Sequence, residues 1–323
     1  MSRPRLRAII AILACLLLSA GAARAEDAPA WPTHAITLVV AFSPGTAVDL
    51  AGRAVAQNLS TALGQPVIVE NRAGSGGVVG SVTVAKAPAD GYTLLMTGIG
   101  PAVLRPLIDP TVTYDPVADF TPIILVGDAV NVLATTPNRF ASVADVVAYA
   151  KANPGKLSIG HSGAGTMGHL IALLFAAEAG FDATFVGYPG SSPLVTDLAG
   201  GHIDTGVIVY VPGSDATKIL AVGTQDRVDF LPGVPTLAES GYPKVVGSTW
   251  NAIFAPAGLP APIASRLNAA IAAFLAEPEM RKRFAAAGYR LLGGPAQLLR
   301  DRMANDRAKW SKVVETANLR GAH

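Results

Sequence analysis

Apolar and polar residues follow two periods along the chain, one typical of buried strands and one typical of helices. The almost continuously apolar run from Ile36 to Phe42 predicts a buried strand. It stops at Ser43-Pro44-Gly45, and apolar residues then recur at helical spacing from Ala47 to Leu63, where Gly64 supplies the stop. Because this strand–turn–helix order returns along most of the chain, the pattern predicts an α/β protein with largely parallel sheets.

The same pattern locates other elements. Ser142 and Asp145 form a capping box, which predicts a helix that ends before Asn153. A chain of 323 residues is long enough for two compact lobes. No linker rich in Pro, Gly and Ser separates them in the sequence, so we expect the chain to cross between lobes within strands. Further strands are predicted at 66–70, 92–96 and 157–160, and further helices at 167–179, 261–275, 278–287 and 295–317.

The first 25 residues have the pattern of a secretory signal peptide. Three arginines within the first seven residues precede an apolar run from Ala8 to Ala20, and Ala23-Arg24-Ala25 matches the small-x-small cleavage pattern. The apolar run is shorter than the roughly 20 residues that a membrane span needs. We therefore expect export, with cleavage after Ala25 and a mature chain that begins at Glu26.

Removal of the leader changes the charge of the protein. The full chain has 25 basic and 23 acidic residues. The leader contains four arginines and no acidic residue, so the mature chain has 21 basic and 23 acidic residues and a net charge of −2. This balance argues against nucleic acid as a partner. Cys15, the one cysteine, lies in the leader, so we expect a mature fold without disulfides that is held together by its hydrophobic core.

The turn after the first predicted strand places backbone N–H groups at a helix N-terminus, where they can hold an anion. The stretch "SPGTAVDL" has no lysine followed by Ser or Thr, which excludes a phosphate-binding P-loop. It has one glycine where a dinucleotide-binding turn needs three. The stretch alone fits an ordinary helix cap, with Asp49 in the first turn complementing the helix dipole.

The strongest enzymatic signal is "GHSGAG", residues 160–165, which is similar to the nucleophile elbow G-x-S-x-G and would make Ser162 a nucleophile. The match fails where Ala164 replaces a glycine. The elbow also needs an acid and then a histidine later in the chain, but His202 follows Asp197 too closely and His323 is the last residue. A secreted serine hydrolase that uses Ser162 therefore stays the alternative to a binding protein.

Metal-binding patterns are weaker still. The mature chain has no cysteine, and its histidines show no H-x-x-x-H or H-E pairing, so we expect no metal and no other cofactor. The histidines are His34, His161, His169, His202 and His323.

Loops rich in Gly, Ser and Thr follow several predicted strands and precede helices. In open α/β sheets ligands bind at this edge. Charge-assisted hydrogen bonds from N–H groups contribute ~1.5–3 kcal/mol each, so a few can hold a carboxylate without an arginine. An exported chain with two lobes and no clear catalytic group is typical of a solute receptor. The loops are residues 43–49, 71–80, 97–100, 161–169 and 187–192.

Longer segments resemble one receptor family, the periplasmic solute receptors of tripartite tricarboxylate transporters, often called Bug receptors. The resemblance covers the mature chain from Trp31 to Trp310. It is carried by "ITLVVAFSPG…VD", "ALGQPVIVENRAGSGGVVG", "ADGYTLLM", "YDPVADFTPI", "ANPGKLSIGHSGAGTMGHL", "LPGVPTLAESGYP", "FAPAGLPAPIASRLNAAI" and the late "KW". The stretches "GQPVIVENRAGSGG" and "LPGVPTLAESG" are the most specific.

The resemblance implies a type II periplasmic-binding-protein fold, with two α/β lobes joined by two crossing strands and a ligand cleft between them. It implies a first lobe at 26–127, a second at 128–246, and a mostly helical return to the first at 247–323. It also implies a monomer that binds a small organic carboxylate by hinge closure and delivers it to membrane transporter subunits. A receptor that signals to a sensor protein is a further possibility.

Site residues follow from the same resemblance. The first-lobe loop would hold the ligand's carboxylate, largely through backbone groups, and two second-lobe loops and one acidic residue would complete the site. The implied residues are Phe42, Ser43, Pro44, Gly45, Thr46, Ala47 and Asp49 in the first lobe, and Ser162, Thr166, His169, Tyr188, Gly190, Ser191 and Asp204 in the second.

Departures from the family pattern bear on the ligand. Thr46 replaces a glycine, two hydroxyls become Ala47 and Val48, and Pro189 stands where a basic residue is usual. The connection 212–218 is also shorter than usual. Since these changes remove side-chain donors and add apolar surface, they predict a monocarboxylate with an apolar or aromatic body.

Overall fold

The computed structural model describes residues 31–213 and 216–321. The predicted leader, residues 1–25, lies outside the described residues, and the short connection 212–218 is described only in part. Residues from His34 onward form one compact unit built on two sheets. Its helices alternate with strands along most of the chain, which confirms the α/β class. The prediction of largely parallel sheets was wrong, because four of the described strand pairs are parallel and five are antiparallel. Among the described residues, no helix is long and apolar enough to span a bilayer.

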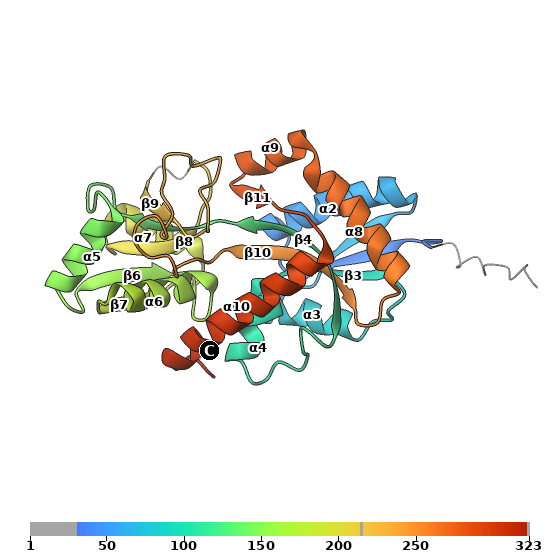
Figure 1. Cartoon of the computed structure of the whole chain (residues 1–323), viewed down its shortest axis with the longest axis horizontal. Helices are drawn as coiled ribbons and strands as arrows, with labels where there is room; N and C mark the ends of the chain where they lie inside the picture. Colours follow the sequence, from blue (N-terminus) through green and yellow to red (C-terminus); the bar gives the residue numbers. More distant parts are fainter. Residues whose placement is uncertain (1–30, 214–215, 322–323) are drawn as a thin grey trace, which may run out of the picture. The chain divides into compact units, whose positions relative to one another are not determined.

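The first sheet has six strands in the order β11-β4-β10-β3-β1-β2. β1, β2 and β3 run parallel, while β10 is antiparallel to both β3 and β4. Helices cover both faces: α2 and α8 pack on one side, and α3 and α10 lie toward the other (Figure 1). The strands are β1 (Ile36–Val40), β2 (Val67–Asn71), β3 (Thr93–Gly98), β4 (Phe120–Ala129), β10 (Thr249–Pro256) and β11 (Tyr289–Leu291). The helices around them are α2 (Ala47–Leu63), α3 (Val78–Ala85), α4 (Arg105–Ile108), α8 (Ala261–Ala276), α9 (Pro278–Ala286) and α10 (Ala296–Thr316).

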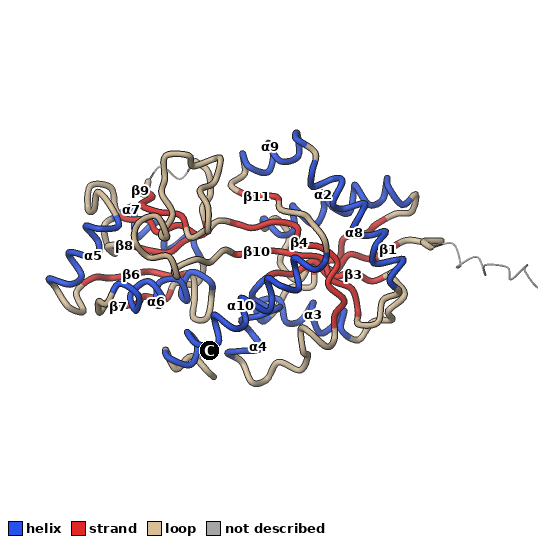
Figure 2. Tube along the Cα trace, in the orientation of Figure 1, coloured by secondary structure: helices blue, strands red, loops and turns tan. Residues whose placement is uncertain are grey.

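The second sheet has five strands in the order β7-β6-β8-β5-β9. β6 is parallel to both β7 and β8, and β5 is antiparallel to its neighbours. Figure 2 shows these strands with helices on both sides. The elements are β5 (Asn131–Thr135), α5 (Val143–Ala152), β6 (Leu157–His161), α6 (Met167–Ala179), β7 (Ala183–Gly187), α7 (Ser191–Gly200), β8 (Thr205–Val209) and β9 (Lys218–Val222).

The two faces of the second sheet belong to different hydrophobic clusters, because side chains alternate along a strand. Leu133 of β5 joins a cluster with residues of α6, whereas its neighbours Val132 and Ala134 join a cluster with residues of α7. Val207 and Ile208 of β8 divide in the same way. The central strands are therefore apolar at consecutive positions, as expected for a sheet covered on both faces.

The sequence pattern correctly predicts where several helices begin or end. α2 and α6 begin and end where predicted, and Gly64 and Gly180 end them at φ +70° and +66°. The capping box of Ser142 is present at the start of α5. β4 and β5 were not among the predicted strands, because the run "FTPIILVGDAVNVLAT" has no Pro–Gly break where one strand ends and the next begins.

The chain passes between the sheets at a single residue, Val130, which separates β4 from β5. β10 brings it back after β9, so two segments join two lobes, as the predicted fold class requires. The exact lobe boundaries at 127/128 and 246/247 stay predictions.

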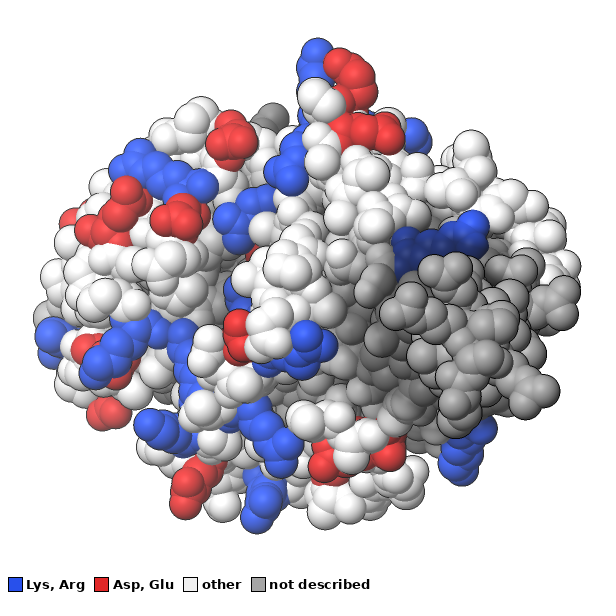
Figure 3. Space-filling model, turned by 45° about the vertical axis from the view of Figure 1, so that its right-hand side comes forward, with Lys and Arg blue, Asp and Glu red and all other residues white. Residues whose placement is uncertain are grey.

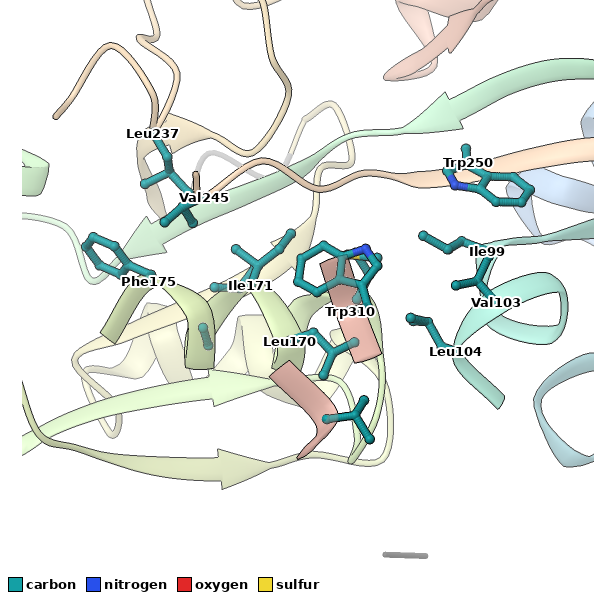
Figure 4. Close-up of a cluster of buried hydrophobic side chains, with 14 of the residues drawn as sticks. Ile99, Val103, Leu104, Leu170, Ile171, Phe175, Leu237, Val245, Trp250 and Trp310 are labelled. Carbon is teal, nitrogen blue, oxygen red and sulfur yellow. The ribbon is translucent and has the colours of Figure 1, made fainter. Parts of the chain in front are cut away.

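One core cluster contains residues from both lobes. In Figure 4, Trp310 of α10 lies between Ile171 of α6 and Leu104, which follows β3. Trp310 is fully buried, and a Cβ on Gly247 would come within 3.0 Å of its indole ring and of Ile171. Apolar packing therefore continues across the segments that join the lobes.

A buried polar network lies beside these segments. The carboxylate of Asp128, with no exposed surface, accepts two hydrogen bonds from Arg290, at 3.1 and 3.0 Å, and one from the Ser248 hydroxyl at 2.8 Å. Arg302 donates to the Ser248 hydroxyl at 3.2 Å. These bonds tie the end of β4 to the residue before β10, to β11 and to α10.

Charges of both signs lie side by side over the described part of the face in Figure 3. The ion pair between Arg72 and Glu70 is a surface pair, with both side chains a little under half exposed. Exposed pairs of this kind contribute little to stability, whereas a buried pair is costly to break.

We expect Arg290→Ala to lower the free energy of unfolding by about 3–5 kcal/mol, because it leaves the buried Asp128 without its main partner. Arg72→Ala is the matched control and should change it by no more than about 0.5 kcal/mol. Urea unfolding of both variants measures the difference. Equal losses for the two variants would show that the Asp128 network does not stabilise the fold.

Candidate functional site

Three strands of the first sheet end at one edge. Because β1, β2 and β3 are parallel, the loops after Val40, Asn71 and Gly98 all leave from this edge. A Cβ on Gly77 would lie 3.3 Å from Cζ of Phe42 and 2.5 Å from Cγ of Pro101, so the three loops touch. The residues predicted for the first-lobe site thus lie at the sheet edge where ligands bind in α/β proteins.

The loop after β1 is held by the N-cap of α2. Thr46 accepts a hydrogen bond from the Asp49 N–H at 3.3 Å and donates to the Ser43 carbonyl at 2.9 Å. Gly45 has φ +81°, a conformation that a side chain disfavours. The exposed residues Ser43–Ala47 therefore form a fixed turn rather than a free loop.

Asp49 is buried and acts inside the turn. Its carboxylate accepts hydrogen bonds from the Gly45 N–H at 2.9 Å, from Asn71 at 2.8 Å and from Arg53 at 3.0 Å. Burial alone would raise the pKa of this carboxyl, but the hydrogen bonds from Arg53, Asn71 and Gly45 outweigh burial and lower it. Asp49 therefore shapes the turn, and its oxygens are occupied by the protein.

The arrangement leaves N–H groups directed outward. The first N–H groups of a helix have no intrahelical acceptor. Within 31–213 and 216–321, the structure gives those of Ala47 and Val48 no acceptor, whereas those of Gly45 and Asp49 are bonded. Two donors at the positive end of a helix dipole are suited to an anion.

The second sheet presents a similar edge. β6 and β7 are parallel and end together, with His161 opposite Gly187, so the loops after them are neighbours. Thr166 caps α6, accepting from the His169 N–H at 3.4 Å and donating to the Gly163 carbonyl at 2.8 Å. Thr166 and His169 are thus brought together as predicted.

Two histidines stack beneath this loop. The rings of His161 and His169 lie 3.9 Å apart at 18°, and both are buried. His169 Nδ1 accepts the Gly165 N–H at 3.1 Å, so Nδ1 carries no proton. Burial, with a smaller effect of His161, lowers the pKa of His169 to about 4, and burial also lowers the pKa of His161. Both rings are therefore neutral at pH 7.

Tyr188, Gly190 and Ser191 lie where β7 leads into α7. The Tyr188 hydroxyl donates to Asp197 at 2.7 Å, and burial together with this carboxylate raises the pKa of Tyr188 to about 12. Gly190 is the N-cap of α7 at φ +110°, and Ser191 is the first residue of the helix. The tyrosine hydroxyl is thus committed to α7, and a second helix N-terminus lies beside that of α6.

Asp204 is not brought to this edge. It precedes β8, which runs parallel to β6 with Thr205 opposite Ile159, so it lies toward the beginning of these strands. Its carboxylate accepts hydrogen bonds from Arg139 and Ser158 at about 3 Å. The expectation that Asp204 joins the ligand loops therefore needs correction, because parallel pairing places it at the opposite end of the strand.

The alternative catalytic constellation is not assembled around Ser162. A serine nucleophile needs a base within hydrogen-bond reach. His161 Nδ1 lies 3.0 Å from the Gly163 carbonyl, and His169 Nδ1 accepts the Gly165 N–H. Among the residues that the structure describes, Ser162 has no bond to either histidine.

One residue of the first lobe was missed by the sequence reasoning. Arg105 begins α4, and a Cβ on Gly76 would lie 3.0 Å from both its Nε and Nη2 atoms. Ile108, on the same short helix, would lie 2.7 Å from a Cβ on Gly165. α4 therefore touches both the glycine-rich loop of the first lobe and the α6 loop of the second. "RPLI" carries no motif that could have indicated this.

A hollow of about 990 Å³ lies elsewhere, between α6, α10 and residues 243–246. Its lining includes Leu173, Lys309 and Lys312, and it contains none of the predicted site residues. The loops at the sheet edges, with the N-termini of α2, α6 and α7, remain the better candidate for binding an anion.

Asp49→Ala should lower the free energy of unfolding by about 3 kcal/mol, because three donors lose a buried acceptor. Asp145→Ala is the matched control, since Asp145 holds the same third position in α5 but is exposed, and we expect a loss of about 1 kcal/mol. Urea unfolding compares the two. Losses of the same size would contradict a special role for Asp49.

A pH dependence follows from His169. Its pKa is lower in the folded protein than the usual 6.5, so its contribution to stability is complete above pH 6.5 and is lost as the pH falls toward 4. We expect the native chain to lose about 2–3 kcal/mol more than His169→Asn between pH 7 and pH 4, since Asn can still accept the Gly165 N–H. Denaturant titrations across this range measure it, and parallel curves for the two proteins would contradict the prediction.

Comparison with known proteins identifies the family of the chain. Residues 51–319 match the model of the tripartite tricarboxylate transporter family receptor. BugT of Bordetella pertussis is 35% identical over 313 residues, which is 95% of this chain and 96% of BugT. The structure of R. palustris Rpa4515 with adipate is 36% identical, with a TM-score of 0.76 over 89% of this chain and 98% of that one.

The structure of MatC from Rhodopseudomonas palustris with bound malate is 27% identical, with a TM-score of 0.73 over 88% of this chain and all of that one. The two-lobed α/β fold predicted from the sequence is the fold of these neighbours. The chain belongs to the tripartite tricarboxylate transporter receptor family.

Proposed function

We propose that this receptor captures a small organic carboxylate at the N-terminus of α2, closes its two lobes around it, and delivers it to the membrane subunits of a tripartite transporter. We further propose that it acts in the periplasm, as a monomer, after cleavage behind Ala25. Binding is its whole activity in this proposal, and Ser162 performs no catalysis.

One observation carries the proposal. The buried Asp49 fixes the turn after β1 so that the N–H groups of Ala47 and Val48 stay available at the sheet edge. An uncharged cradle of this kind favours an anion through the helix dipole and hydrogen bonds. The adipate and malate bound by two structural neighbours are carboxylates, which supports the same class for this chain.

The body of the ligand faces apolar groups in this proposal. The ring of Phe42, which is partly exposed, lies close to Gly77 next to the turn. Burying apolar ligand surface against it contributes about 25 cal/mol per Å². The sequence predicts an apolar or aromatic monocarboxylate, and this side chain supports the apolar body.

Thermal unfolding against a panel of carboxylates and their amides tests the proposal. An acid at 100 times its Kd adds about 2.7 kcal/mol, which for a chain of this size raises Tm by roughly 5 °C. The protein should first be unfolded and refolded to remove any bound ligand. No shift with any acid after this step would sink carboxylate capture.

Ala47→Pro locates the carboxylate. Proline is well tolerated at the first position of a helix, where its ring replaces an N–H without an intrahelical acceptor, and Thr46 already has the extended ψ of 159° that suits a residue before proline. We expect folding stability to be kept and carboxylate affinity to fall about 10-fold or more. Ala296→Pro, at the same position of α10, is the control and should leave affinity unchanged. Unchanged affinity in Ala47→Pro would place the carboxylate elsewhere.

A further inference from the structure

Arg105 is a cation without an anionic partner beside the proposed site. It is half-buried, at the start of α4, and within 31–213 and 216–321 no carboxylate lies at ion-pair distance from it. The next acid along the chain, Asp109, receives the N–H and the hydroxyl of Thr111 at 2.9 and 2.6 Å. Partial burial of a guanidinium without a counter-charge costs free energy, and a bound anion would offset this cost.

The position of the guanidinium is set by the glycine-rich loop. A Cβ at Gly76 would come within 3.0 Å of Nε and Nη2 of Arg105, so glycine at this position lets the guanidinium lie against the backbone. Gly76 also has φ +64°, which disfavours other residues. Next to it, Gly77 lies against Phe42, whose chain continues into the turn at the N-terminus of α2.

The same helix reaches the second lobe. Ile108 follows Arg105 by three residues, which places both on one face of a helix, and Ile108 meets Gly165 in the loop that caps α6. Arg105 therefore lies between the loops of the two lobes. A ligand held by the α2 N-terminus and enclosed by these loops would have its far end within this neighbourhood.

We propose that Arg105 binds a second anionic group on the ligand, so that the receptor selects an acid with an apolar body and an anionic group at each end. This inference rests on the proposed function, and it revises the monocarboxylate predicted from the sequence. The two ends are recognised differently: backbone N–H groups of α2 hold the first carboxylate, and the forked donors of Arg105 hold the second. A planar guanidinium suits a carboxylate because it can donate two parallel hydrogen bonds.

Binding of adipate and of hexanoate, measured by calorimetry, tests the proposal, because the two acids share the chain of six carbons and differ in the second carboxylate. We expect the native protein to bind adipate about 10- to 100-fold more tightly than hexanoate. Arg105→Gln should remove this difference while leaving hexanoate binding unchanged. A series of α,ω-diacids from succinate to suberate should show one preferred length, since both ends are fixed.

Arg72→Gln is the matched control. Arg72 follows β2 on the same side of the lobe, but it is paired with Glu70, so its loss should leave the adipate preference unchanged. Arg105→Lys keeps the charge without the fork and should retain part of the preference. If a melting curve without ligand shows that Arg105→Gln does not fold, Arg105→Lys takes its place in the test.

The outcomes separate the two proposals. If adipate and hexanoate bind equally to the native protein, or if Arg105→Gln keeps the preference, the role of Arg105 is overturned while carboxylate capture stands. If the preference is lost equally in Arg72→Gln, general electrostatics and not Arg105 accounts for it. If none of the acids in the series binds, the proposed function fails and the inference fails with it.

Discussion

The crossing between the two sheets is the constraint on which the rest of this structure depends. Val130 alone separates a strand of one sheet from a strand of the other, so the sheets cannot shift freely at this point. The buried carboxylate of Asp128 stands two residues earlier and is bonded to Arg290 and Ser248. A charge removed from water is tolerated only with such partners, and here the partners come from the segments that must stay together for the lobes to keep their relation.

Asp49 applies the same rule on a smaller scale. Its carboxylate is satisfied by Gly45, Asn71 and Arg53, which come from the turn, from β2 and from the next turn of α2. The fold thus uses one buried acid to fix the crossing and another to fix the turn at the proposed site. At both places the backbone is arranged around the charged group. At the turn, the N–H groups that Asp49 does not bind, those of Ala47 and Val48, are suited to a ligand.

Much of the fold could be predicted from the sequence because the signals are local. Gly64 and Gly180 end their helices, and Thr46 and Ser142 begin theirs, with side-chain chemistry that depends on a few neighbouring residues. The passage from β4 to β5 could not be predicted, because a change of sheet within an unbroken apolar run depends on pairing with distant strands.

The site shows the same division. The turn at 43–49 and the loop at 161–169 follow strands, so their place at a sheet edge was predictable. Asp204 was misplaced because a motif says which strand a residue precedes, but parallel pairing decides at which end of the sheet it lies. Arg105 was missed because only the three-dimensional structure places it over Gly76, 29 residues earlier in the chain.

The position of β10 has a consequence for the order in which the protein can acquire its structure during synthesis. β10 pairs with β3 and with β4, and it lies between them in the sheet. The first sheet therefore stays divided until residues 249–256 have been made, more than 100 residues after β4. The second lobe lies wholly between these strands in the sequence and can form its sheet earlier. A nascent chain that cannot close its first sheet before most of it has been made completes its fold late, after its second lobe has had time to form.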